Sequence, residues 1–158
     1  MNLKNALKNL TIKADYISLR LVKKRIILLM VRNEKFEGLT KDNDTGIMIE
    51  VLKDGQFGYA ATSDISLAGL NEASAKALQL ANKANQYNLM KFTLNERPPV
   101  IGKYISPFVS GFDEFNAKDT SDLMINLSNS MKVSDKIINR SVFFSINEME
   151  TTFVSSNG

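Results

Sequence analysis

The stretch TGIMIEVLKDGQFGYAATS, residues 45–63, predicts a β-hairpin around which the rest of the chain is organised. Its turn is Asp54-Gly55, because a two-residue type I′ loop needs positive φ at both positions, and Asp followed by Gly tolerates this well. Counting outward from the turn gives the register, in which the pairs are Lys53–Gln56, Leu52–Phe57, Val51–Gly58, Glu50–Tyr59 and Ile49–Ala60.

The two faces of this hairpin differ, since side chains alternate across a sheet. One face carries Ile47, Ile49 and Val51 opposite Thr62, Ala60 and Gly58. The other face carries Met48, Glu50 and Leu52 opposite Ala61, Tyr59 and Phe57. On the first face, one strand carries β-branched side chains and the other carries small side chains or none. We therefore expect this face to accept a helix at close range.

A helix suited to that face follows directly, over about residues 67–87. Ser66 is its expected N-cap, because a serine hydroxyl can accept a hydrogen bond from an amide of the first turn. Small and apolar residues recur at steps of three and four, which is the period of one helix face. They are Leu70, Ala73, Ala77, Leu80, Ala81, Ala84 and Tyr87.

Residues 46–64 also form a composite pattern: a Gly, alternating apolar residues, a polar-Gly turn, an aromatic residue, a Gly, small residues, Thr and Asp. In this chain its members are Gly46, Ile47, Ile49, Val51, Asp54, Gly55, Phe57, Gly58, Ala60, Ala61, Thr62 and Asp64. Followed by an Ala-rich helix, the pattern resembles the N-terminal domain of the TldD/PmbA family, bacterial and archaeal metallopeptidases historically called modulators of DNA gyrase. Weaker resemblance lies at residues 14–16 and 155–158.

The first 44 residues predict a short helix and several strands with short connections. The helix covers residues 3–10, and strands are expected at residues 16–22, 26–32 and 35–39. Lys23-Lys24 should separate the first two strands, Asn33-Glu34 should form a turn, and residues 41–44 should form a polar loop. Residues 26–32 are apolar on both faces, which favours a central place in the sheet.

The second half of the chain predicts a surface excursion at residues 95–107, with a short strand at 100–105, and no role is assigned to residues 95–118. A second helix should begin at Asp119 or Thr120 and bury Leu123, Met124, Leu127 and Met131. A strand at 137–146, a turn near Asn147-Glu148 and a strand at 151–155 follow. Residues 1–158 are therefore expected to form a single α+β domain, a mostly antiparallel sheet with two main helices packed on it.

The composition limits the chemistry of the chain. There are no cysteines, which excludes disulfides, thiolate catalysis and iron–sulfur ligation. There are no histidines, so the commonest metal ligand and the commonest general base are missing. The net charge is +3 and only Lys23-Lys24-Arg25 cluster, whereas nucleic-acid binders usually show a concentrated basic face. Direct nucleic-acid binding is therefore not expected. No secretory signal or membrane-spanning run is recognisable, and the cytoplasm is the expected compartment.

Three short motifs invite a functional interpretation. The loop at residues 42–46 does not match the calcium-binding spacing of an EF-hand, so a turn is the better interpretation. Gly55 to Gly58 matches the Gly-x-x-Gly of KH domains but lies inside a predicted strand pair instead of joining two helices. Glu50 faces Tyr59 across the hairpin, and we expect it at a solvated sheet edge; a buried carboxylate with a raised pKa is the alternative. No residue is assigned as catalytic, cofactor-binding or metal-binding.

The resemblance implies a larger protein than this chain. Family members carry a zinc-binding HExxxH motif with a further Cys ligand in a C-terminal domain, and neither can exist here. It implies zinc in that missing domain, no cofactor in this chain, a homo- or heterodimeric partner subunit, and peptides or unfolded chains as substrates. Some family members lack the zinc motif and serve as partner subunits, so whether the full-length protein is an enzyme stays open.

The end of the sequence favours the same interpretation. Asn157-Gly158 is a strong hairpin signal with no strand after it, so we expect a fragment cut at a domain boundary. A frayed tail at residues 156–158 is the alternative. A stand-alone peptide- or protein-binding scaffold without enzymatic activity is the second functional hypothesis.

Overall fold

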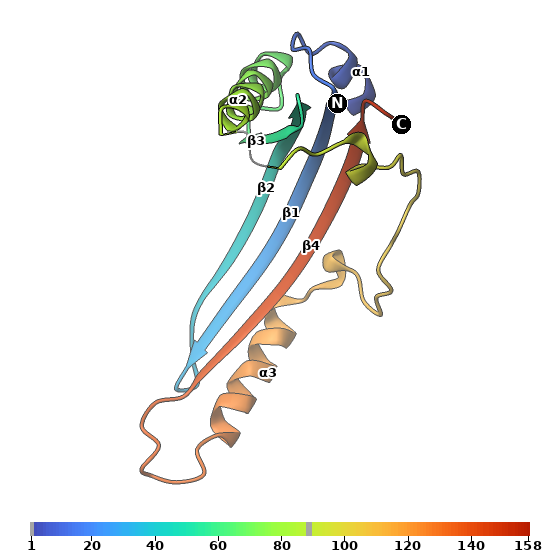
Figure 1. Ribbon diagram of the computed structural model, residues 1–158. Helices are drawn as coiled ribbons and strands as arrows, with labels where there is room; N and C mark the ends of the chain where they lie inside the picture. Colours follow the sequence, from blue (N-terminus) through green and yellow to red (C-terminus); the bar gives the residue numbers. More distant parts are fainter. Residues whose placement is uncertain (1, 88–89) are drawn as a thin grey trace. The chain divides into compact units, whose positions relative to one another are not determined.

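The computed structural model describes residues 2–87 and 90–158, which form an α+β fold (Figure 1). The described residues contain a four-stranded antiparallel sheet with the strand order β3-β2-β1-β4. The helices are α1 (Leu3–Lys8), α2 (Leu67–Asn85) and α3 (Ala117–Ser130), with short 3-10 turns at Leu94–Glu96 and Phe112–Glu114. The strands are β1 (Tyr16–Arg32), β2 (Lys35–Lys53), β3 (Gln56–Thr62) and β4 (Ser141–Ser155).

The predicted hairpin forms with the predicted register. Its turn has φ of 51° at Asp54 and 85° at Gly55, as a type I′ loop requires. The pairing of β2 with β3 runs from Lys53 opposite Gln56 to Ile47 opposite Thr62 without a slip. The register could be predicted because a two-residue turn fixes every pair that follows it.

Helix α2 packs on the hairpin face that was predicted to accept it. The Ser66 hydroxyl accepts a hydrogen bond from the Gly69 amide at 3.2 Å, which confirms the N-cap. A Cβ atom at Gly58 would lie 2.7 Å from the amide nitrogen of Ala81, so the helix approaches as closely as a bare backbone permits. The residues of α2 that face the core include Leu70, Ala73, Ala77 and Ala81.

Two residues that were assigned to this helix face lie outside it. Leu80 is 42% exposed, because it sits at the margin of a stripe already filled by Ala77 and Ala81. Tyr87 is 74% exposed, because the helix ends at Asn85 and the residue lies beyond it. The prediction was therefore right about the small residues of the stripe and wrong about its two bulky members.

The strands are longer than the sequence predicted. β1 continues through Lys23-Lys24, and β4 begins only at Ser141 and continues through Asn147-Glu148, where a break and a turn were expected. The charged residues pair across the two strands instead of interrupting them: Lys23 contacts Glu150 at 3.4 Å, and Arg25 contacts Glu148 at 2.5 Å. Residues 41–44 likewise belong to β2 although all four are exposed, because β2 remains hydrogen-bonded beside β1.

Contacts between Cα atoms divide the chain into two compact units. The first comprises residues 1–23, 45–104 and 150–158. Its core joins β1, β2 and α2 with α1, whose Leu3 and Ala6 are buried as the short-helix prediction required. The core residues of the sheet are Ile17, Leu19, Leu21, Ile47, Ile49 and Val51. The single-domain prediction for residues 1–158 stays a prediction.

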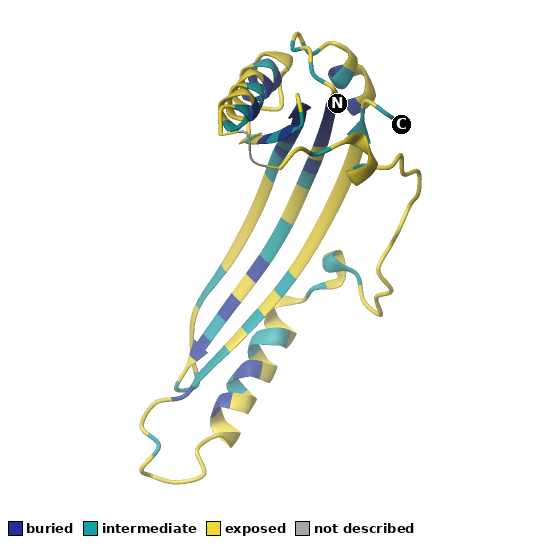
Figure 2. Cartoon of the chain, viewed as in Figure 1, coloured by how far each residue is buried: buried dark blue, intermediate teal, exposed yellow. Residues whose placement is uncertain are grey.

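The second unit comprises residues 24–44 and 105–149, and its core lies between α3 and one face of β1 and β4. Buried positions alternate along this part of β1 at Ile27, Leu29 and Val31 (Figure 2). The central place predicted for residues 26–32 is confirmed by the strand order. The opposite face is less covered than their composition indicated, since Leu28 is 46% exposed.

Helix α3 differs from its prediction in its cap and in its buried face. Asn116 is the N-cap and accepts hydrogen bonds from the amides of Lys118 and Asp119, so the helix begins before the expected Asp119 or Thr120. Met124 is buried, as predicted, and Ser128 is also buried, which was not predicted. Leu123, Leu127 and Met131 are 59%, 47% and 45% exposed.

The excursion at residues 95–107 is exposed apart from the half-buried Arg97, and the predicted strand at 100–105 does not form. Pro98, Pro99 and Pro107 flank or enter this segment and remove three of its amide donors, which disfavours pairing. Among the described residues, no helix is both long enough and apolar enough to span a membrane.

Candidate functional site

The side chain of Glu50 lies at the centre of a polar cluster in the first unit. It projects from β2 on the face away from α2 and is only 6% exposed. Four hydrogen bonds reach its carboxylate: from Arg97 Nη2 at 2.6 Å, Arg97 Nε at 3.0 Å, Tyr59 Oη at 3.1 Å and Ser18 Oγ at 3.2 Å. These donors come from β1, β3 and the segment after α2, so the cluster joins three parts of the unit.

The protonation of the cluster follows from these contacts. Burial raises the pKa of Glu50, but the hydrogen bonds from Arg97, Tyr59 and Ser18 and the charge of Arg97 outweigh it, so its pKa lies below the ordinary value. Burial and the neighbouring Glu50 carboxylate raise the pKa of Tyr59. At neutral pH the cluster therefore holds an ionised Glu50, a charged Arg97 and a neutral Tyr59 hydroxyl.

Arg97 is held in place from several sides. Its guanidinium lies 4.7 Å from the centre of the Phe57 ring, which is a cation–π contact, and donates to the Glu96 carbonyl at 2.9 Å. Its own carbonyl accepts a hydrogen bond from Asn157 Nδ2 at 2.7 Å. Directly before it, Thr93 and Glu96 form a capping box that closes a 3-10 turn. The first part of the excursion is thus attached to the hairpin.

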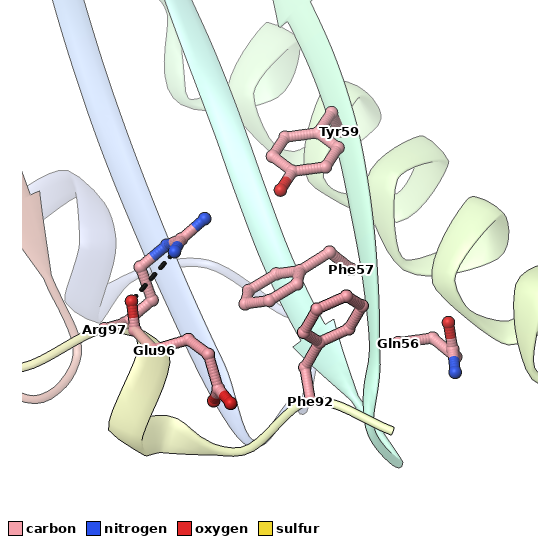
Figure 3. A pocket seen from close by; sticks show the side chains of 6 residues that line it. All are labelled: Gln56, Phe57, Tyr59, Phe92, Glu96 and Arg97. Atoms are coloured by element: carbon pink, nitrogen blue, oxygen red, sulfur yellow. Dashed lines mark hydrogen bonds between the residues drawn. The ribbon is translucent and has the colours of Figure 1, made fainter. Parts of the chain in front are cut away.

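An aromatic pocket of about 390 Å³ lies beside this ion pair (Figure 3). The rings of Phe57 and Phe92 are 5.3 Å apart, and those of Phe57 and Tyr59 are 6.1 Å apart. Apolar walls next to one positive and one negative side chain are typical of sites that hold small ligands or side chains of a partner. The residues that line it are Gln56, Phe57, Tyr59, Phe92, Glu96 and Arg97.

Sequence reasoning singled out Glu50 but described its surroundings wrongly. The residue is not at a solvated edge. It is buried, as the alternative interpretation held, but its pKa is lowered instead of raised. The reason is Arg97, which the sequence analysis did not consider and which lies 47 residues further along the chain. The Thr93-x-x-Glu96 spacing of a capping box could have indicated an ordered turn there, but nothing local indicates where Arg97 reaches.

The other motifs have structural roles or none. Residues 42–44 lie in exposed positions of β2, so the loop expected there is absent and the calcium interpretation has no support. The Gly55–Gly58 segment forms the turn and the start of β3, where Gly58 leaves room for α2 as expected. Asp113, Glu148 and Glu150 pair with basic residues of β1.

The donor set of the described residues does not fit the zinc centre that the resemblance implies elsewhere in such proteins. With no His and no Cys in the sequence, only carboxylates remain, and the described residues contain no group of three or more side chains that could hold a metal ion. Structural and catalytic zinc sites in proteins rely on imidazole or thiolate ligands. No catalytic step through zinc is therefore assigned to this chain.

Comparison with known families supplies the decisive observation. Residues 17–81 match the family model described as PmbA/TldA metallopeptidase domain 1. This segment of the chain is therefore similar to the first domain of the PmbA/TldD family. The match covers nearly all of β1, all of β2 and β3 and most of α2, and it includes residues 46–64, on which the resemblance was based. Among curated proteins, no sequence matches the chain.

Solved structures share the fold of this chain at 16% sequence identity. TldE from Thermococcus kodakarensis has a TM-score of 0.67, with 98% of this chain and 34% of that chain covered. Two proteins described as putative modulators of DNA gyrase also match. The one from Bacteroides thetaiotaomicron has a TM-score of 0.70 and coverages of 98% and 35%, and the one from Thermotoga maritima has 0.67, 90% and 32%. The chain thus spans about a third of the length of each.

Proposed function

We propose that this chain is the non-catalytic N-terminal domain of a TldD/PmbA-type metallopeptidase that degrades peptides or unfolded chains. In this proposal the domain shapes the substrate chamber and contributes to contacts with a homo- or heterodimeric partner subunit. Zinc and the catalytic residues would belong to a C-terminal domain, and the protein would work in the cytoplasm.

The match of residues 17–81 to a metallopeptidase domain 1 carries this proposal. The likeness of the fold to TldE supports it, because in that protein the region with this fold is about a third of the chain. The composition agrees as well, since a chain without His and Cys must leave zinc ligation to another part of the protein.

A contribution to assembly is supported by apolar side chains that the described residues leave uncovered. In the second unit Leu123, Leu127 and Met131 form a stripe along the outer side of α3, each at least 45% exposed. Large exposed apolar surfaces of this kind usually mark interaction sites. We therefore assign this stripe, the α3 outer stripe, to contacts with the rest of the assembly.

The proposal is tested on the protein encoded by the whole reading frame. We expect the frame to continue beyond Gly158 into an HExxxH segment, and the purified protein to hydrolyse a fluorescently labelled unfolded protein at a chelator-sensitive rate. Replacing Leu123 and Leu127 together by Ser should weaken the dimer in sedimentation experiments. Replacing the exposed Asn126 and Asn129 by Ser on the same helix is the matched control and should leave the dimer unchanged.

Two results would contradict the proposal. A protein that lacks residues 1–158 yet cleaves and assembles as before would show that the domain has neither role. A reading frame that stops after Gly158 would instead favour the stand-alone scaffold.

A further inference from the structure

We propose that the outer edge of β3 and the aromatic pocket beside it bind an extended peptide, with main-chain hydrogen bonds to β3 and one apolar side chain in the pocket. This inference rests on the proposed function, which makes peptides or unfolded chains the substrates. It adds the place where this domain would hold such a segment and the groups that would contact it.

The position of β3 provides the first argument. It is the terminal strand in the order β3-β2-β1-β4, so only one of its sides pairs with β2. Within residues 2–87 and 90–158, one main-chain bond lies next to the start of the other side, from the Phe92 amide to the carbonyl of Gly55 in the turn before β3. The remainder of β3 presents amide and carbonyl groups that a further strand could pair with.

The register identifies which groups these are. In a hairpin with a two-residue turn, the pair that flanks the turn is hydrogen-bonded, and hydrogen-bonded pairs then alternate with non-hydrogen-bonded ones. The pairs at Gln56, Gly58 and Ala60 therefore point their main-chain groups toward β2. Those of Phe57, Tyr59 and Ala61 point outward, toward the free edge.

The side chains of the same three residues lie on one face of the hairpin. Phe57 and Tyr59 line the aromatic pocket, and Figure 3 shows their rings on the same side of β3 as Phe92. In an added antiparallel strand, a residue hydrogen-bonded to Phe57 or Tyr59 would place its side chain on this face. A single peptide residue could thus form edge hydrogen bonds and fill the pocket.

The chain itself occupies the beginning of this edge in a similar way. The Phe92 amide donates to the Gly55 carbonyl at 2.9 Å, and Gln56 Nε2 donates to the Met90 carbonyl at 2.7 Å. The Phe92 ring packs on Phe57 with 5.3 Å between ring centres. This arrangement is the contact that we propose for the next residues of the edge: a main chain alongside β3 and an aromatic ring in the pocket.

The sequence of the edge strand lacks the residues that commonly prevent strand addition. Natural edge strands are commonly protected by Pro, by Lys or by other charged residues. β3 has the sequence QFGYAAT and contains none of these. Of the three outward-facing residues, Tyr59 is 45% exposed, Ala61 is exposed and Phe57 is half-buried. Recognition through the main chain would accept many sequences, as the degradation of unfolded chains requires.

The test uses a blocked, fluorescein-labelled peptide, Thr-Val-Phe-Val-Thr, titrated with the 158-residue chain and followed by fluorescence anisotropy. Ala61→Pro removes an amide that faces the free edge while sparing the ladder to β2, and we expect about tenfold weaker binding. Ala61→Ser keeps the amide and should bind within about twofold of the unchanged chain. Circular dichroism melts of both variants check that the fold is retained.

Two N-methylated peptides make the test independent of any substitution. Methylation of the Phe amide, which would face β3, should weaken binding about tenfold, whereas methylation of one Val amide, which would face solvent, should not. Absence of binding by the parent peptide would overturn the inference. So would equal affinities for Ala61→Pro and Ala61→Ser, or for the two N-methylated peptides. Dimerisation that Ala61→Pro abolishes, without peptide binding, would assign the edge to a second copy instead. The proposed function is judged separately, by the reading frame and by hydrolysis.

Discussion

Glu50 shows most clearly how a single residue organises the first unit. Its carboxylate is buried and paired with Arg97 Nη2 at 2.6 Å, while Tyr59 and Ser18 complete its hydrogen bonds. A buried charge is tolerated only when it is paired and hydrogen-bonded in this way. The same carboxylate fixes Arg97 beside Phe57 and so defines one wall of the aromatic pocket.

Replacing Glu50 by Gln should destabilise the chain by about 1–3 kcal/mol at neutral pH, because the guanidinium of Arg97 loses its ionised partner. The pKa of Glu50 is lower in the folded state, so its contribution is present above the ordinary glutamate pKa and is lost as pH falls through the folded value. In urea melts across this pH range, the loss of unfolding free energy caused by Glu50→Gln should become smaller as the pH falls.

Glu72→Gln serves as the control for this experiment, since Glu72 is exposed on α2. A deficit for Glu50→Gln that stays constant down to the most acidic pH would contradict the assigned pairing. The environment of Glu50 could not be predicted from the sequence, because the alternation of β2 gives its face but not the residue that covers it. Its partner, Arg97, comes from a segment with no regular periodicity.

At the scale of elements, predictions succeeded where the deciding residues are neighbours in sequence. The hairpin register depends on Asp54-Gly55 alone, and the cap of α2 depends on Ser66 and the amide of Gly69. Where β1 and β4 continue past their predicted ends, charged residues such as Arg25 and Glu148 pair although they lie far apart in the chain. Charged residues that looked like breaks are therefore strand residues whose partners the sequence does not reveal.

The close packing of α2 on β3 gives a prediction at this scale. Gly58→Ala should destabilise the chain by about 1–3 kcal/mol, because the new methyl would collide with the main chain of α2 at Ala77 and Ala81. Gly38→Ala in β2 is the matched control, since a Cβ there meets no atom within 4 Å. Equal urea midpoints for the two variants would show that the helix does not approach the hairpin as described.

For the whole molecule, the sequence was sufficient to predict the fold class and the family. The composite pattern at residues 46–64 lies inside the segment 17–81 that matches a PmbA/TldA metallopeptidase domain 1. It was not sufficient to predict the exposed face of α3, because helical periodicity gives Leu123 and Leu127 the same weight as Met124. Which apolar residues face the core depends on the sheet beneath the helix.

The central claim is that this chain contributes to a peptidase without providing its catalytic centre. The most direct measurement is hydrolysis of a labelled unfolded protein by the purified chain of residues 1–158, with and without a metal chelator. We predict no chelator-sensitive hydrolysis, because the chain has neither His nor Cys to bind zinc. A chelator-sensitive rate that co-purifies with this chain would contradict the claim.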